Sequence, residues 1–76
     1  MTLDTIPRNT NARVVSVEAS DAHGLRLMEM GLVPGASVRV VRSAPLGDPI
    51  QVCVRNYQLA LRRVEARAIT VAICTK

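Results

Sequence analysis

The chain has 76 residues, of which 49% are hydrophobic, and Tyr57 is its one aromatic residue. A chain of this length builds one small core, so we expect residues 1–76 to form a single domain. Ten basic residues, nine of them arginine, oppose six acidic ones and give a net charge of +4. No apolar run reaches the ~20 residues of a transmembrane helix, and residues 1–11 have no signal-peptide pattern, so we expect a cytoplasmic protein. Cys53 and Cys74 are too few for a disulfide framework.

Valine-rich runs in which apolar and polar residues alternate indicate five short strands. The sequence predicts them at residues 12–18, 36–43, 49–55, 57–61 and 68–74. In the second and third strands the alternation sets one apolar side, made of Val38, Val40, Ile50, Val52 and Val54. Five short strands in so few residues favour a small closed or half-closed barrel, because closure removes exposed sheet edges.

One helix is predicted between the first two strands, at residues 21–30. Ser20 or Asp21 can cap its start by accepting a backbone hydrogen bond. Gly31 suits its end, because glycine enters the left-handed conformation without steric cost, and Leu32 would then fold back onto Leu27. Residues 33–36, with the sequence VPGA, predict a type II turn.

The predicted helix is apolar over a wider arc than docking on a core requires. At about 100° per residue from Leu25, Leu27 lies at about 200°, Met28 at about 300° and Met30 at about 140°. The apolar arc therefore spans about 220°, roughly twice the usual stripe. Either a loop covers the second apolar side or that side meets a partner.

Two further segments connect the strands. Residues 44–49, APLGDP, predict a turn-rich connector, because two prolines without amide donors stop the sheet ladder. Residues 62–67 predict a short helical turn before the last strand. The expected order is strand, helix, three strands, helical turn, strand.

Nothing in the sequence marks a catalytic site, and we expect no enzyme. No nucleophile motif accompanies the single histidine, His23, and no phosphate-binding glycine loop is present. A spatial cluster of His23, Cys53 and Cys74 with a carboxylate could hold a divalent metal such as Fe²⁺ or Zn²⁺. Structural metal sites bring their ligands in close pairs, however, so the sequence favours two small apolar thiols, a solvated histidine and no cofactor.

Arginines that could form a basic face for phosphate recur along the chain: Arg39, Arg42, Arg55, Arg62, Arg63 and Arg67. Proteins that bind single strands usually stack bases on aromatic rings, and this chain offers only Tyr57. The composition therefore favours a solvated basic surface, or one that binds an acidic protein, over a surface for nucleic acid.

Three blocks, in this order, resemble the ferrous iron transport protein A (FeoA) family: LRLMEMGLVPG at 25–35, APLGDPI at 44–50 and LALRR at 59–63. The ending ITV at 69–71 resembles it too, so the resemblance covers nearly all the chain from the first strand onward. It implies a mainly β fold, an SH3-like small β-barrel of about five strands. One helix would lie between strands 1 and 2 and a short helical turn before the last strand. Iron- and manganese-dependent repressors carry a similar domain, but we expect no repressor because no helix-turn-helix precedes the barrel.

The resemblance implies a small cytoplasmic accessory of bacterial ferrous iron uptake. Its partner would be ferrous iron transport protein B, a membrane transporter with a GTP-binding domain, which would recruit it to the inner face of the membrane. The accessory would support assembly of the transporter or modulate its GTP-binding domain. We expect no nucleic-acid partner and no direct membrane insertion, while exposed strand edges could support a homodimer. A nucleic-acid-binding barrel and a metal-binding or metal-sensing SH3-like domain remain the alternatives.

We expect the site residues to be partner contacts rather than catalytic groups. Leu27, Met30 and Leu32 would offer the spare apolar side at the helix exit. The connector would present a stiff loop with Leu46 exposed at its tip, formed by Pro45, Leu46, Gly47, Asp48 and Pro49. Arg62 and Arg63 would add charge complementarity, which governs encounter rate and specificity more than affinity.

Overall fold

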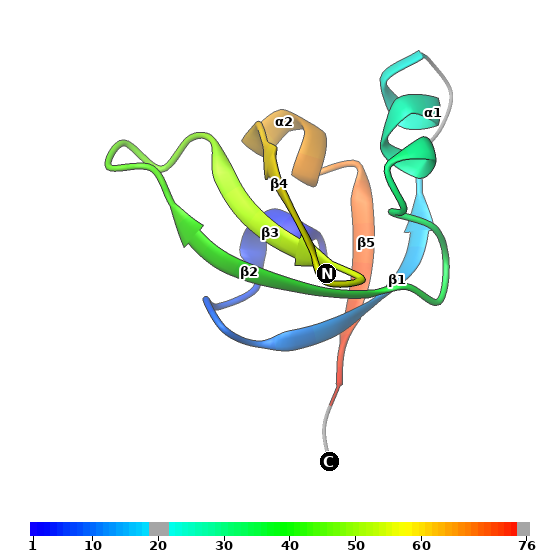
Figure 1. Cartoon of the computed structure of the whole chain (residues 1–76), viewed down its shortest axis with the longest axis horizontal. Coiled ribbons are helices and arrows are strands. Elements are labelled where there is room, and N and C mark those ends of the chain that lie inside the picture. The colour runs from blue at the N-terminus through cyan, green and yellow to red at the C-terminus, as the bar shows by residue number, and fades with distance from the viewer. Residues whose placement is uncertain (19–21, 75–76) are drawn as a thin grey trace.

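The computed structural model describes residues 1–18 and 22–74, except the side chains of residues 22 and 23. The predicted caps Ser20 and Asp21 lie outside these residues. The element order is η1 (Leu3–Thr5), β1 (Asn11–Val17), α1 (Ala22–Glu29), β2 (Ser37–Ser43), β3 (Ile50–Val54), β4 (Tyr57–Leu61), α2 (Arg63–Ala66) and β5 (Ile69–Ile73) (Figure 1). The mainly β class and the five predicted strands are confirmed. No helix within the described ranges is long and apolar enough to cross a membrane.

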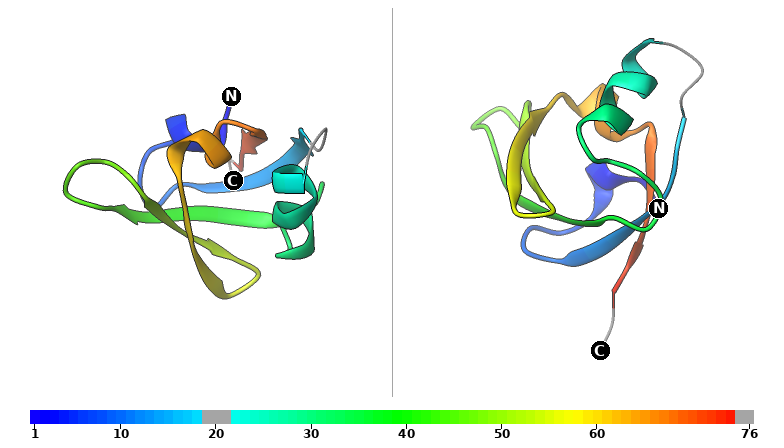
Figure 2. Two further views of the ribbon diagram at one scale, coloured as in Figure 1. Left: turned by 90° about the horizontal axis from the view of Figure 1, so that it is seen from above. Right: turned by 45° about the vertical axis from the view of Figure 1, so that its right-hand side comes forward.

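The strands form one antiparallel sheet in the order β4-β3-β2-β1-β5. Alternate side chains enter the core from β2 and β3, as predicted, and from β1 the core takes Ala12 and Val14. Register shifts interrupt the ladders after Val14 and after Val40. Such bulges bend strands, so the sheet curls around its own apolar side chains (Figure 2).

The N-terminal segment completes the core, although its sequence predicts no element there. Leu3 is fully buried in η1 and Ile6 is 6% exposed. The Val71 amide donates to the Met1 carbonyl at 2.8 Å, and Thr2 forms an isolated bridge with Thr70. The segment therefore pairs with β5, and η1 lies inside the curve of the sheet (Figure 2).

The end of α1 has the hydrogen bonds of a Schellman motif, as Gly31 predicts. The Gly31 amide donates to the Met28 carbonyl at 3.0 Å, and the Leu32 amide donates to the Leu27 carbonyl at 3.2 Å. Gly31 has φ +101°, and both leucines lie in the core. The predicted type II turn follows, in which the Ala36 amide donates to the Val33 carbonyl at 3.0 Å.

Gly31→Ala is expected to lower the free energy of unfolding by about 1–2 kcal/mol, because an alanine is strained in the left-handed region. A steric clash is not the reason for this loss of stability, since an added Cβ would lie 3.4 Å from Val54 Cγ1, an ordinary contact. Urea denaturation measures the effect. Glu29→Ala, at an exposed position of α1, serves as the control and should change the stability by less than about 0.5 kcal/mol. Equal stabilities for wild type and Gly31→Ala would contradict a conformational role for this glycine.

Candidate partner-binding site

The connector between β2 and β3 is a compact loop that projects from one end of the molecule (Figure 1). The Ala44 amide donates to the Pro49 carbonyl at 3.0 Å, and the Gly47 amide donates to the Ala44 carbonyl at 2.7 Å. Gly47 has φ +85°, a conformation that disfavours other residues, and the Asp48–Pro49 peptide bond is cis. Leu46 at the tip is 96% exposed, as the sequence predicts.

Arg63 ties this loop to two other segments. Its guanidinium donates from Nε to the Gly47 carbonyl and from Nη1 to the Asp4 carbonyl of η1, the latter at 3.2 Å. Its backbone amide donates to Asp48 Oδ1 at 3.0 Å. A Cβ at position 47 would lie 3.5 Å from Arg63 Nε, an ordinary contact, so the positive φ of Gly47 and not a lack of space favours glycine there. We call these bonds the Arg63 clamp; they fix the loop against α2 and η1.

The two adjacent arginines therefore have different environments. Arg63 is half-buried, and its polar atoms face backbone carbonyls. Arg62 is exposed, and its backbone amide donates to Glu65 Oε1 at 2.9 Å at the start of α2. Of the two charges predicted to face a partner, Arg62 presents its side chain to solvent, while Arg63 braces the loop.

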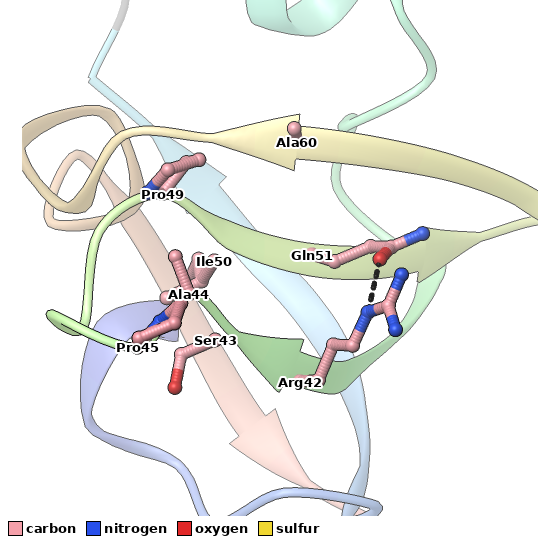
Figure 3. Close-up of a pocket in the computed structure, with 8 residues that line it drawn as sticks. All are labelled: Arg42, Ser43, Ala44, Pro45, Pro49, Ile50, Gln51 and Ala60. Atoms are coloured by element: carbon pink, nitrogen blue, oxygen red, sulfur yellow. Dashed lines mark hydrogen bonds between the residues drawn. The ribbon is translucent and has the colours of Figure 1, made fainter.

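A shallow hollow of about 330 Å³ lies at the base of the connector (Figure 3). Residues of β2, β3, β4 and the connector line it: Arg42, Ser43, Ala44, Pro45, Pro49, Ile50, Gln51 and Ala60. Arg42 Nε donates to Gln51 Oε1 at 2.7 Å along one wall. Sequence reasoning named Arg42 only as one arginine of a possible basic face, and it missed Gln51 and Ala60, because only the strand register brings the three together.

The helix exit does not form the predicted apolar surface. Leu27 is 1% exposed and Leu32 is fully buried, so the prediction that they face a partner is wrong. The Schellman motif turns Leu32 back under the helix, and both side chains join the core. Met30 is half-buried against the same core, whereas Leu25 is a large apolar side chain of α1 that is 57% exposed.

The candidate metal ligands are not gathered in one place. Cys53 is half-buried on β3, and Cys74 is exposed just after β5, with β2 and β1 between those strands. The side chain of His23 lies outside the described residues. Within the part of the chain that the structure describes, no group of three histidine, cysteine or carboxylate side chains could hold a metal ion.

Comparison with known proteins identifies the family. The sequence matches the FeoA domain over residues 1–73. The chain belongs to the FeoA domain family. A solution structure of the FeoA protein from Chlorobium tepidum is 47% identical, with a TM-score of 0.91 over 99% of this chain and 71% of that one.

A crystal structure of Stenotrophomonas maltophilia FeoA complexed with zinc, described as a prokaryotic SH3 domain protein, is 42% identical. Its TM-score is 0.85, over 95% of this chain and 89% of that one. These two FeoA structures show that the fold is the SH3-like fold implied by the sequence blocks.

One FeoA relative is joined to a transporter. The Fe(2+) transport protein A/Fe(2+) transporter FeoB fusion protein of Porphyromonas gingivalis is 36% identical over 73 residues. The match covers 96% of this chain and 9% of the fusion protein. The chain thus corresponds to a small part of a polypeptide that also contains a transporter.

Proposed function

We propose that this chain is an accessory of ferrous iron transport that binds the transporter FeoB at the inner face of the membrane and catalyses no reaction itself. The fusion protein of P. gingivalis supports this partner, because it holds an FeoA domain and FeoB in one polypeptide. Ferrous iron is the cargo of the transporter in this proposal and does not contact the chain. The core, which runs from Leu3 to Val71 in one cluster, supports treating residues 1–76 as one domain.

The observation that carries the binding surface is Leu46, 96% exposed at the tip of a loop fixed from several sides. A leucine side chain that stays in water contributes almost none of the free energy that its burial would give. Burial of that side chain in a partner contributes about 1.5–3 kcal/mol. Because the loop is already ordered, binding does not carry the cost of ordering it.

Three features around Leu46 complete the proposed surface. The hollow behind the connector would accept an apolar side chain of the partner against Ile50 and Ala60. Val64 of α2 is 64% exposed, and Arg62, directly before α2, is exposed as well. An apolar centre with a charged rim is the usual anatomy of a protein–protein interface. Pro45, Gly47, Asp48 and Pro49 shape the loop, and Arg63 holds it.

Leu46→Asp is expected to weaken binding to the full-length, detergent-solubilised transporter of the same host by about 10- to 100-fold, which corresponds to the lost burial of one leucine. The fold should be unchanged, because Leu46 is 96% exposed and contributes little to the core. Fluorescence titration measures the affinity, and circular dichroism and thermal unfolding check the fold. Leu25→Asp is the matched control, since Leu25 is an exposed leucine on α1, at the other end of the molecule (Figure 1).

Two results would contradict the proposed function or its binding surface. If the wild-type chain does not bind the transporter at moderate salt, the proposed function fails. If Leu46→Asp folds normally and binds as tightly as the wild type, the function stands and the loop is not its binding surface. Repeating the titration with GDP and with a GTP analogue separates the two roles. A nucleotide preference supports modulation of the GTP-binding domain, and equal affinities support assembly.

A further inference from the structure

The outward side of β1, β2 and β3 carries a group of arginines that the proposed binding surface does not use. Arg39 lies opposite Asn11 on β1 and opposite Cys53 on β3, and Arg13 lies opposite Ser37. Residues directly opposite each other on antiparallel strands share a face, so Arg13 and Arg39 are diagonal neighbours, about 7–8 Å apart. Both are exposed. Arg55 is also exposed, but it lies in the turn after β3 with φ +48°, where the alternation of the strand does not assign its side chain to this side. We call Arg13 and Arg39 the basic face.

No carboxylate among the described residues neutralises the basic face. The register partners of Arg13 and Arg39 are all uncharged: Asn11, Ser37, Cys53 and Ala72. The carboxylates with assigned partners are bound elsewhere: Asp4 to Arg67, Asp48 to the amide of Arg63 and Glu65 to the amide of Arg62. Glu18 follows the far end of β1, and Glu29 lies on α1. Neighbouring like charges destabilise a sheet, so this face is suited to an anionic partner.

The residues of the basic face indicate which class of partner it can bind. None of the described helices lies over it, because η1 is inside the curve of the sheet and the other helices lie beyond the strand ends (Figure 2). Its side chains between the arginines are polar or small, without the apolar centre of a protein interface. The exposed Tyr57 pairs with the core residue Val54, so the register sets it on the other side of the sheet from Arg39, and the basic face has no aromatic side chain among the described residues for stacking nucleic-acid bases. Anionic lipid headgroups attract basic groups by charge alone, so their binding needs neither an apolar centre nor aromatic side chains.

We propose that the basic face binds an anionic membrane surface. This goes beyond the proposed function, since Arg13 and Arg39 belong neither to the connector that carries Leu46 nor to the lining of the hollow, and the contact would orient the domain on the lipid beside its transporter. The contact is electrostatic and inserts nothing into the bilayer. Each arginine close to an anionic surface strengthens membrane partitioning by about fivefold, and salt weakens the attraction by screening it.

The test uses the purified chain and vesicles without any transporter, so its result does not depend on the proposed function. The chain is expected to co-sediment with phosphatidylcholine vesicles that contain phosphatidylglycerol, at low salt, and not with vesicles of phosphatidylcholine alone. Arg13→Gln/Arg39→Gln should weaken this binding by about 25-fold, at about fivefold per charge. Arg26→Gln/Arg67→Gln has the same net charge and should keep most of the binding, because neither arginine lies on the basic face.

Each other outcome overturns the proposal. Equal binding to both kinds of vesicle, or none to either, shows that the face does not recognise anionic lipid. Equal losses of vesicle binding in the two double variants show that the net charge of the chain, and not this face, determines the binding. Tighter binding to duplex RNA or DNA than to the anionic vesicles, lost in Arg13→Gln/Arg39→Gln, assigns the face to nucleic acid. Circular dichroism checks that both variants fold.

Discussion

Leu27→Ala is expected to lower the free energy of unfolding by about 2–5 kcal/mol, the range for truncating a buried leucine. Leu27 is 1% exposed and lies in the core with Leu32, whose amide donates to its carbonyl. A chain of this size has about 4–11 kcal/mol of stability in all, so the loss is a large part of it. Urea denaturation followed by circular dichroism measures the change.

The control for this variant lies two residues earlier on the same helix. Leu25→Ala makes the same chemical change at a side chain that is 57% exposed, and we expect a stability change below about 0.5 kcal/mol. Leu27→Ala and Leu25→Ala remove the same atoms from the same helix, so the difference between their stability losses reports the difference in burial. Equal losses in the two variants would show that Leu25 is as buried as Leu27 in solution, and that the apolar arc of α1 is covered on both sides.

Arg63→Met is expected to release the connector. Methionine keeps an apolar stem of similar length and removes the donors to the Gly47 and Asp4 carbonyls. Hydrogen bonds to a charged group contribute about 1.5–3 kcal/mol, and partial exposure of Arg63 reduces this, so we expect a loss of about 1–2 kcal/mol. The more specific result is faster hydrogen exchange at the Gly47 amide, which donates to Ala44 within the loop. Hydrogen exchange followed by NMR measures it.

Arg62→Met is the matched control for the Arg63 clamp. It removes the same charge from the neighbouring residue and leaves the backbone bond from its amide to Glu65 in place. Exchange at Gly47 and stability should both stay near the wild-type values. If Arg63→Met leaves Gly47 exchange unchanged, the turn within the loop is sufficient to order it, and Arg63 acts only as a surface charge.

The strands and turns were predictable because their signals are local. Alternation in β2 and β3 requires only that one side faces the core, and the sequence shows it within five or seven residues. Gly31 and the turn after it follow from backbone conformation that few other residues adopt. The exposed tip at Leu46 follows from the surrounding turn residues in the same way.

The remaining features depend on contacts between distant residues. Leu3 and Ile6 show no helical or strand period, so only the finished sheet reveals that they fill its interior. The helical wheel of α1 showed an apolar arc of about 220° without showing which of its residues the next segment would cover. The role of Arg63 depends on Asp4, 59 residues earlier, and on Gly47. A pair of adjacent arginines in the sequence contains no sign that one is turned inward.

The 59-residue separation between Arg63 and Asp4 also links the connector to the completion of folding. The guanidinium reaches Gly47 and Asp4 together only when the two ends of the chain have met across the sheet. A chain in which the N-terminal segment has not yet docked lacks one of the supports of its loop. Leu46 therefore has every support of its loop only in the fully folded domain, and a partner that required the fully supported loop would bind finished chains in preference to unfinished ones.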